Sequence, residues 1–483
     1  MSLGRQTLSG GLWNLLANVG QQALNFVFFV YMARLLEPSA FGLVALALVL
    51  VDIAQPLGRV GLVEVMIRRK DLDDAFLNRV FWFLQAVGVA LVLLVLAAAH
   101  PLGAAFGHAE LAVVLVWLAP VCWLQNLCAV PEARLQREFG YKSLTKRTLV
   151  GVSVGGTVGL ALALAGFGVE ALVLQKIATV LVQSVILWLS DGWVPGRPVF
   201  RTTAEFRRSL RMGVDVMASS LMNMFNTKLL DVLIGAVWGA AVLGYFRTAW
   251  KIFEILIYCT VQPLVGVAFV AFTKLDGEAA RLVGAYRRMT EVSSLLFVPA
   301  LLGMSAVAPL LVPLLLGDKW QPSSDLLRVF GFMAFAAAVD PFFAPMMTAA
   351  GRTSALVKQG TAQAILSVAS ILVAAPFGVV AMAVGQVVRA SLVEIVNLVV
   401  MKKELALPYA ATWASLRPAA IAGLAMWAGV VALSTVLPAS LGAWTRLAGL
   451  ITAGAALYAA VLLLVFRGHV TGLLATVRGY DRR

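Results

Sequence analysis

The chain has 483 residues, of which 61% are hydrophobic and 13% charged, and its mean hydropathy is +0.91. A soluble domain is about half apolar and about a quarter charged, so this composition excludes a soluble globular protein and predicts an integral membrane protein. The formal net charge is +14. Nucleic-acid binding is a competing interpretation of this charge, but the basic residues flank apolar segments, so we expect no nucleic-acid partner.

Uncharged runs recur along the sequence, and each approaches the ~20 residues that cross ~30 Å of hydrocarbon. One example is VFWFLQAVGVALVLLVLAAA from Val80. The alternating segments of outer-membrane barrels do not occur in the sequence, so we predict an all-α polytopic membrane protein with about fourteen transmembrane helices. Their expected ranges are roughly 12–33, 40–66, 76–99, 110–131, 147–166, 168–190, 212–236, 241–272, 290–316, 325–349, 357–375, 378–401, 416–437 and 446–466.

The basic residues are divided unevenly between the two sides of the predicted spans. If the N-terminus is cytoplasmic, the even-numbered connections carry most of them, with clusters at 68–70, 134–147, 197–211 and 402–403. The opposite connections carry chiefly Arg34, Lys319 and Arg446. Because cytoplasmic loops hold an excess of lysine and arginine, we expect both termini in the cytoplasm.

Segments about 200 to 210 residues apart resemble each other. GFGVEALVLQK from Gly166 matches PFGVVAMAVGQ from Pro376, and SAFGLVALAL from Ser39 matches AVLGYFRTAW from Ala241. An internal duplication with six helices in each copy explains both matches. We therefore predict a six-helix lobe at 1–195, a second six-helix lobe at 196–405, and two further helices with a cytoplasmic tail at 406–483.

Polar side chains form a stripe on the first predicted helix, and the pattern recurs on the seventh. At 100° per residue the five amides of the first helix lie within an arc of roughly 100°. The positions are Asn14, Asn18, Gln21, Gln22 and Asn25 on the first helix, and Asp215, Ser219, Asn223 and Asn226 on the seventh. Amides bond across membrane helices for about 0.6–2 kcal/mol, so the stripes are either contacts between helices or the lining of a water-filled cleft. Their matching places in the two halves favour the cleft.

Charged residues also fall inside the predicted spans. A charge at the bilayer centre costs about 2.5–3.5 kcal/mol, so these side chains must be paired or hydrated. Lys228 and Asp231 are three residues apart and either neutralise each other or have other partners. Arg59 and Arg389 have acidic residues five positions on, a poor spacing for a pair on one helix, so their partners are expected on other helices or in a ligand. Arginine presents paired donors to phosphate oxygens.

The sequence gives no sign of a metal or nucleotide site. The three cysteines lie in apolar runs without paired spacing, and the three histidines are scattered, so no metal is implied. A Walker A motif is absent, so we expect no ATP hydrolysis and no cofactor. Coupling to an H⁺ or Na⁺ gradient through Asp52, Asp215, Asp231 or Asp340 is our hypothesis for the energy source.

Three runs of the sequence, in this order and spacing, are similar to one known family. They are ARLLEPSAFGLVALALV from Ala33, VPEARLQREFGYKSLTKR from Val130 and LLDVLIGAVWGAAVLGYFRTAWKI from Leu229. Over about residues 5–400 the chain resembles the polysaccharide transporter branch of Wzx-type flippases, within the multidrug/oligosaccharidyl-lipid/polysaccharide (MOP) exporter superfamily. Asp231 fits an acidic position of that family, whereas Arg247 departs from its pattern.

The resemblance implies two six-helix lobes around a central cavity lined chiefly by helices 1, 2, 7 and 8. It implies a flippase of the bacterial inner membrane, not an enzyme, that moves undecaprenyl-pyrophosphate-linked oligosaccharide units by alternating access for exopolysaccharide, capsule or O-antigen assembly. The polar stripes are then the candidate sugar-facing residues. The lipid-linked oligosaccharide and the membrane are the expected partners, and the polymerase and export machinery are candidate partners. The candidate pyrophosphate contacts are Arg59, Lys228, Arg247, Lys251 and Arg389.

Other functions stay open. A multidrug antiporter or a peptidoglycan-precursor flippase of the same superfamily would share the architecture, although so many cations do not suit a site for cationic drugs. A membrane polysaccharide polymerase or ligase would be expected to carry reactive residues in a large exoplasmic loop, and the predicted connections on that side are short. A non-catalytic scaffold would not need charges at mid-membrane.

Overall fold

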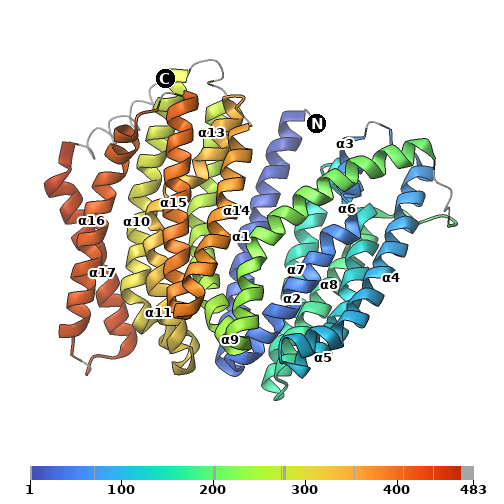
Figure 1. Cartoon of the computed structure of the whole chain (residues 1–483), viewed down its shortest axis with the longest axis horizontal. Helices are drawn as coiled ribbons and strands as arrows, with labels where there is room; N and C mark the ends of the chain where they lie inside the picture. The colour runs from blue at the N-terminus through green and yellow to red at the C-terminus, as the bar shows by residue number, and fades with distance from the viewer. Residues whose placement is uncertain are drawn as a thin grey trace. The chain divides into compact units, whose positions relative to one another are not determined.

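The computed structural model describes residues 3–69, 71–198, 203–273, 275, 279–352, 354–405, 407–438 and 440–468. Within these ranges, the side chains at 3–12, 14, 15, 226, 259, 262, 263, 267, 270 and 279 lie outside the described set. All regular secondary structure in the described ranges is helical (Figure 1). The predicted all-α class is therefore confirmed.

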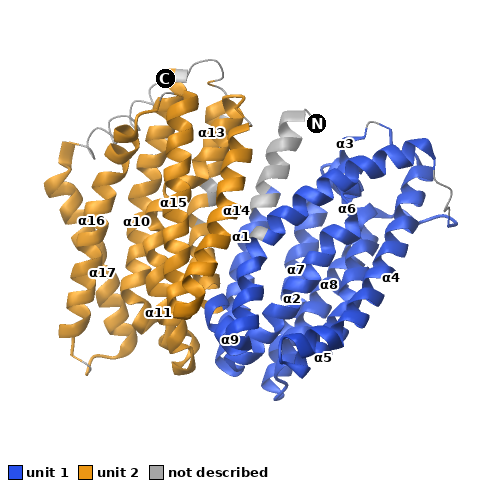
Figure 2. Ribbon diagram, viewed as in Figure 1, with its two compact units in different colours: residues 1–247 blue, residues 248–483 orange. Residues whose placement is uncertain are grey.

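The chain divides into two compact units, Met1–Arg247 and Thr248–Arg483 (Figure 2). Unit 1 contains α1 (Leu3–Leu35), α2 (Pro38–Arg59), α3 (Leu62–Arg68), α4 (Asp74–Ala105), α5 (Ala109–Leu127), α6 (Ala129–Arg137), α7 (Tyr141–Leu164), α8 (Val169–Asp191) and most of α9 (Ala204–Thr273). Unit 2 contains the rest of α9, α10 (Ala279–Leu316), α11 (Gln321–Phe330), α12 (Ala334–Ala337), α13 (Phe343–Ala349), α14 (Ser354–Ala374), α15 (Val379–Leu405), α16 (Tyr409–Val436) and α17 (Ala443–Val465). The lobe boundaries at 195 and 405 concern the duplication and stay a prediction.

The apolar helices match a protein that crosses a membrane many times. In the described part of the chain, eleven helices are long and apolar enough to span a bilayer, or twelve if the bent pair Asp318–Ala337 and Asp340–Ala349 is one span. Helices also cover each of the fourteen predicted ranges. Helix α1 is not among the eleven candidate spans, and α9, which covers two predicted ranges, contributes one candidate span. The chain is thus a polytopic membrane protein with about eleven or twelve candidate spans.

The element α9 consists of two helices, and the chain reverses its direction between them at Gly239. This glycine has φ 83° and ψ 177°, which no helical residue adopts. Asp231 and Arg247 stand eight residues before and after it, and their side chains form an ion pair at 3.4 Å. In a continuous helix these two residues would lie about 24 Å apart. The turn falls between the predicted helices 212–236 and 241–272.

Two glycines that the internal repeat makes equivalent meet in unit 1. A Cβ on Gly42 of α2 would lie 1.6 Å from the carbonyl oxygen of Ala240, and one on Gly244 of α9 would lie 2.0 Å from that of Pro38. Only glycine permits backbones to approach so closely. The first turns of two repeat-related helices therefore cross in direct backbone contact.

The predicted helix 40–66 is wrong in its second part, because the chain breaks after Arg59. Val60 and Gly61 both adopt left-handed conformations, with φ 48° and 61°. A Cβ on Gly61 would lie 2.2 Å from the carbonyl oxygen of Gly213 in α9. The close approach of α9 to this turn separates α2 from the short helix α3.

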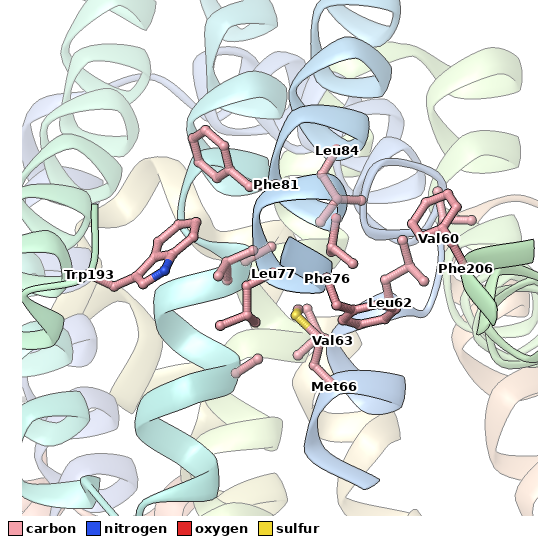
Figure 3. Close-up of a cluster of buried hydrophobic side chains, with 14 residues drawn as sticks. Val60, Leu62, Val63, Met66, Phe76, Leu77, Phe81, Leu84, Trp193 and Phe206 are labelled. Atoms are coloured by element: carbon pink, nitrogen blue, oxygen red, sulfur yellow. The ribbon is translucent and has the colours of Figure 1, made fainter. Parts of the chain in front are cut away.

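The turn lets α3 pack into an apolar cluster of unit 1 (Figure 3). Met66 of α3 and Phe76 of α4 are almost fully buried in it, and Phe206 at the start of α9 meets the Phe76 ring edge-on at a centroid distance of 6.3 Å. The guanidinium of Arg69 lies 4.0 Å from the centroid of the Phe76 ring and forms an ion pair with Glu205. The cluster fixes the start of α9 on α3 and α4.

The predicted helix 325–349 is also wrong as a continuous element. The chain forms α11, a 3₁₀ turn at Gly331–Met333, α12, a second 3₁₀ turn at Asp340–Phe342, and α13, with a bend of 42°. Pro341 disfavours a helical conformation at Asp340 and cannot donate a backbone hydrogen bond. The break leaves Asp340 at a bend instead of inside a regular helix.

The repeat motifs lie at corresponding turns of the two units. Helix α8 begins at Val169 and α15 at Val379, in each case directly after a Phe–Gly pair. The preceding helices, α7 and α14, pack against α8 and α15 respectively. The duplication itself stays a prediction.

Replacement of Gly42 by alanine should destabilise the protein, because the new methyl group would overlap the Ala240 carbonyl and separate α2 from α9. We expect a loss of about 2–4 kcal/mol, measured by thermal unfolding of the purified protein in detergent. The matched control is Gly360→Ala in α14, where a Cβ meets no atom within 4 Å. An equal loss of stability in both variants would contradict the role given to the crossing.

Candidate functional site

An ion pair joins α2 to α9 within unit 1. The Lys228 Nζ donates to Asp52 Oδ2 at 3.1 Å, and both side chains are largely buried. Neutralisation of Lys228 by Asp231, one of the two alternatives left by their spacing, is therefore wrong. Positions three apart on a helix diverge by about 60°, and Asp231 instead pairs with Arg247 across the turn at Gly239.

A second charged group joins α2, α6 and α7. Arg59 donates to Glu132 Oε2 at 2.9 Å, and Arg147 Nη1 lies 3.4 Å from the same oxygen. All three side chains are mostly buried. Two cations share one carboxylate, so the group keeps one net positive charge. The Nε atoms of both arginines are buried without a hydrogen-bond partner among the described residues.

The amides of α1 centre on a different part of the helix surface from the residues that pack on α7. A Cβ on Gly20 would lie 2.9 Å from Leu149, and one on Gly156 would lie 2.2 Å from Phe28, so Gly20 and Phe28 mark the packed face. At 100° per residue the described amides centre roughly 110° round the helix from that face. Whether they form contacts between helices or line a cleft stays a prediction.

The environments of the individual stripe residues differ. Asn18, Gln21, Gln22 and Asn25 are half-buried, and the Gln22 side-chain oxygen is buried without a hydrogen-bond partner. Asp215, Ser219 and Asn223 of α9 are exposed. The side chains of Asn14 and Asn226 lie outside the described residues. An exposed carboxylate such as Asp215 is incompatible with hydrocarbon, so this face of α9 requires water or polar groups.

The two predicted cations in unit 2 have different partners. Lys251 Nζ lies 3.7 Å from Glu254 on the next turn of α9. Arg389 of α15 donates through Nε to the Gln386 side-chain oxygen at 2.9 Å. Arg389 is thus the one predicted pyrophosphate contact whose described partner is an amide instead of a carboxylate.

Two carboxylates of unit 2 share one amide donor. The Asn397 Nδ2 donates to Asp340 Oδ1 at 2.9 Å and to Glu394 Oε2 at 3.3 Å, and Gln359 also donates to Asp340 at 3.1 Å. Glu394 is 8% exposed and Asn397 fully buried, whereas Asp340 is exposed. The other side-chain oxygens of Glu394 and Asn397 are buried without hydrogen-bond partners among the described residues. The hydroxyl of Tyr286 is also fully buried in unit 2.

Sequence reasoning missed several members of these groups. Glu132 lies just beyond the predicted helix 110–131, although the helical region continues to Arg137 as α6. Arg147 belongs to a cluster of basic residues that, from the sequence, indicates only topology. Asn397 and Gln386 each lie three residues from a charged residue on α15, a helical spacing that indicates them as partners.

The described residues contain no group of three histidine, cysteine, aspartate or glutamate side chains that could hold a metal ion. Cys122 and Cys128 are buried thiols, and Cys128 lies 3.1 Å from the hydroxyl of Ser184. The arrangement of unit 1 is therefore one of paired charges, and that of unit 2 combines carboxylates with amides. Both suit the binding of charged or hydrated ligands.

Comparison with known proteins identifies relatives of this chain. The family model described as "Polysaccharide biosynthesis protein" matches residues 31–325, more than half of the chain. The lipopolysaccharide biosynthesis protein WzxC of Escherichia coli K12 is 25% identical over 410 residues, which cover 82% of this chain and 80% of that protein. The succinoglycan biosynthesis transport protein ExoT of Rhizobium meliloti is 25% identical over 344 residues, which cover 71% and 69%.

The fold is similar to that of solved transporters. The lipid II flippase MurJ in an inward closed conformation aligns with a TM-score of 0.72 at 12% identity, over 96% of this chain and 100% of that one. An inward-facing multidrug resistance transporter of the MATE family, in the MOP superfamily, aligns with a TM-score of 0.59 at 17% identity, over 81% and 94%. The match of the family model shows that the chain belongs to the polysaccharide biosynthesis protein family, in which it stands with the Wzx-type transporters of the MOP fold and not with enzymes.

Proposed function

We propose that this protein is a flippase of the bacterial inner membrane. Its substrate would be an oligosaccharide unit linked to undecaprenyl pyrophosphate, moved from the cytoplasmic to the periplasmic leaflet for assembly of exopolysaccharide, capsule or O antigen. Membership of the polysaccharide biosynthesis family supports the substrate class, and the names of WzxC and ExoT support the link to surface polysaccharides. The fold shared with MurJ and MATE transporters is compatible with transport.

The observation that carries the proposal is the ion pair between Asp52 and Lys228 inside membrane helices. Each charge would cost about 2.5–3.5 kcal/mol in the centre of the bilayer, so neither side chain faces lipid. At 100° per residue the exposed Asp215, Ser219 and Asn223 lie about 180° round α9 from Lys228. The ion pair therefore holds α2 beside α9, and the exposed polar face on the other side of α9 suits water and a sugar chain.

The proposal includes a finer architecture. Fourteen transmembrane helices would form two six-helix lobes, at 1–195 and 196–405, around a central cavity, followed by two C-terminal helices. Both termini would be cytoplasmic, in accord with the distribution of basic residues. The lobes would rock about the cavity and carry the polar head across while the polyprenyl tail remains in lipid.

We propose the same candidate pyrophosphate contacts as the sequence predicts, and we add one arginine. A pyrophosphate would have to compete with carboxylates for Arg59, Lys228, Arg247 and Lys251, whereas Arg389 is held only by an amide. The group at Glu132 has an excess positive charge, so Arg147 joins Arg59 as a candidate at that place.

The rival functions differ in their substrates. A multidrug antiporter or a peptidoglycan-precursor flippase would use the same fold, and fold similarity below 25% identity does not separate them from our proposal. The family match favours the polysaccharide substrate. A polymerase or ligase is disfavoured by the same match.

The carboxylates of unit 2 are the strongest candidates for ion coupling. Asp340 is exposed, Asn397 bridges it to the buried Glu394, and two acceptor atoms at this place lack partners. A proton or a sodium ion could reach Asp340 and satisfy the oxygens behind it. We therefore add Glu394 to the carboxylates proposed from the sequence, which are Asp52, Asp215, Asp231 and Asp340.

Replacement of Lys228 by alanine should lower the translocation of labelled lipid-linked oligosaccharide in proteoliposomes about tenfold or more. The variant loses a candidate pyrophosphate contact and leaves Asp52 without its partner. The exposed Lys358, which pairs with Glu404 at 3.0 Å, gives the control, and Lys358→Ala should transport normally.

The double variant Asp52→Ala/Lys228→Ala separates the two roles of the lysine. If Lys228 contacts the substrate, the double variant stays as defective as the single one, because removal of Asp52 restores only the local charge balance. Full recovery in the double variant contradicts the substrate contact. Normal polysaccharide export in cells after alanine replacement of each of the five predicted cations would rule out the whole assignment, and failure of the wild type to translocate would refute the flippase itself.

Replacement of Glu394 by glutamine should make translocation insensitive to ion gradients, because the side chain keeps its shape but no longer exchanges a charge. The measurement is transport in proteoliposomes with and without imposed H⁺ and Na⁺ gradients. Glu404→Gln, at the exposed end of the same helix, should keep the wild-type response. Wild-type transport that is unchanged after collapse of both gradients would dismiss the coupling hypothesis.

A further inference from the structure

Unit 2 contains a pocket that the proposed transport function does not use. Its volume is about 390 Å³, and it is lined by Val329, Phe332, Val384, Val387, Trp427 and Arg328. The residues come from α11 and the turn that follows it, α15 and α16. Five of the six are apolar, and the volume falls within the ~300–1,000 Å³ of ligand-binding pockets.

The walls of the pocket are fixed by buried contacts. The fully buried Ser305 of α10 donates to the Arg328 carbonyl oxygen at 2.6 Å and accepts from the Trp427 indole at 3.2 Å. The Phe332 ring meets Trp427 edge-on at 5.3 Å. A Cβ on Gly331 would lie 2.3 Å from the Ser305 Cβ, so only glycine lets α10 approach so closely. The pocket is therefore largely formed before any ligand arrives.

The charge of the pocket comes from Arg328. Its side chain is exposed and has no ion-pair partner among the described residues, although it lies in Asp318–Ala337, the first part of the bent helix pair that can form one span with Asp340–Ala349. An unpaired arginine in a span is costly unless an anion or the interface receives the guanidinium. A ligand with one anionic group and a hydrocarbon chain would satisfy both the arginine and the apolar walls.

The pocket lies toward the ends of the helices that line it. Arg328 stands seven residues after the start of α11, Val384 five after the start of α15, and Trp427 nine before the end of α16. At 1.5 Å per residue these positions lie about 8–14 Å from the helix ends. Arginine extends its charge toward the interface, where phosphates lie, and tryptophan is enriched at this level.

We infer that this pocket binds an anionic glycerophospholipid, with its phosphate on Arg328 and part of one acyl chain against Val384, Val387 and Trp427. A single arginine complements the one negative charge of a phosphodiester. A pyrophosphate carries more charge and suits paired cations, so the polyprenyl-linked substrate fits less well here. The inference does not depend on the proposed flippase activity.

Native mass spectrometry of the purified full chain in neutral detergent tests the site. The probes are phosphatidylglycerol and phosphatidylcholine with identical acyl chains. The wild type should bind phosphatidylglycerol about tenfold more tightly, because its phosphate charge is uncompensated, whereas the choline ammonium of phosphatidylcholine neutralises the headgroup and repels Arg328. Arg328→Gln should abolish this preference, whereas Arg288→Gln, at another exposed arginine of unit 2, should keep it.

A second variant tests the apolar part. Val387→Trp should fill the pocket and weaken the binding of both lipids. Retention of the headgroup preference in Arg328→Gln, equal binding of the two lipids by the wild type, or unchanged binding in Val387→Trp would each overturn the inference. Tighter binding of undecaprenyl phosphate than of phosphatidylglycerol, lost in Arg328→Gln, would assign the site to the polyprenyl carrier and overturn it as well.

Discussion

The cost of an unpaired charge in hydrocarbon is the constraint on which the interior of this protein depends. A helix with Asp52, or one with Lys228, would be expensive to insert alone, but together the two side chains form a pair at 3.1 Å that holds α2 beside α9. Glu132 in the same way joins α2, α6 and α7 through two arginines. The charges that permit a polar interior thus also determine which helices of unit 1 are neighbours.

Hydropathy predicts where helices lie because the cost of exposing a backbone to lipid is local. Each of the fourteen predicted ranges therefore contains helix. The partners of charged residues cannot be predicted from local sequence. Arg59 and Glu132 are 73 positions apart, and Lys228 and Asp52 are 176 apart. The spacing of Lys228 and Asp231 can predict a pair only within one helix. It contains no information about a closer partner on another helix.

The breaks within helices also include some with a local cause in the sequence and some that depend on contacts between distant residues. The turn at Gly239 falls between the predicted helices 212–236 and 241–272, in an apolar run that contains Gly235, Gly239 and Gly244. The turn at Val60 and Gly61 could not be predicted in this way, because it depends on the carbonyl oxygen of Gly213 against Gly61, a contact between distant parts of the chain. Pro341 is a local indication of the bend at Asp340. The apolar run around it is continuous, however, and therefore predicts one helix.

The two units meet the charge constraint in different ways. In unit 1 the buried or half-buried carboxylates Asp52, Glu132 and Asp231 all bind cationic side chains. In α11 to α15 of unit 2, away from the helix ends, Asp340 and Glu394 bind amides, and Arg328 and Arg389 form no ion pair with a carboxylate among the described residues. Opposite charges that are not paired with each other remain available to mobile partners. Unit 1 thus pairs its charges internally, whereas unit 2 keeps charges that suit the ion coupling and the lipid site that we propose.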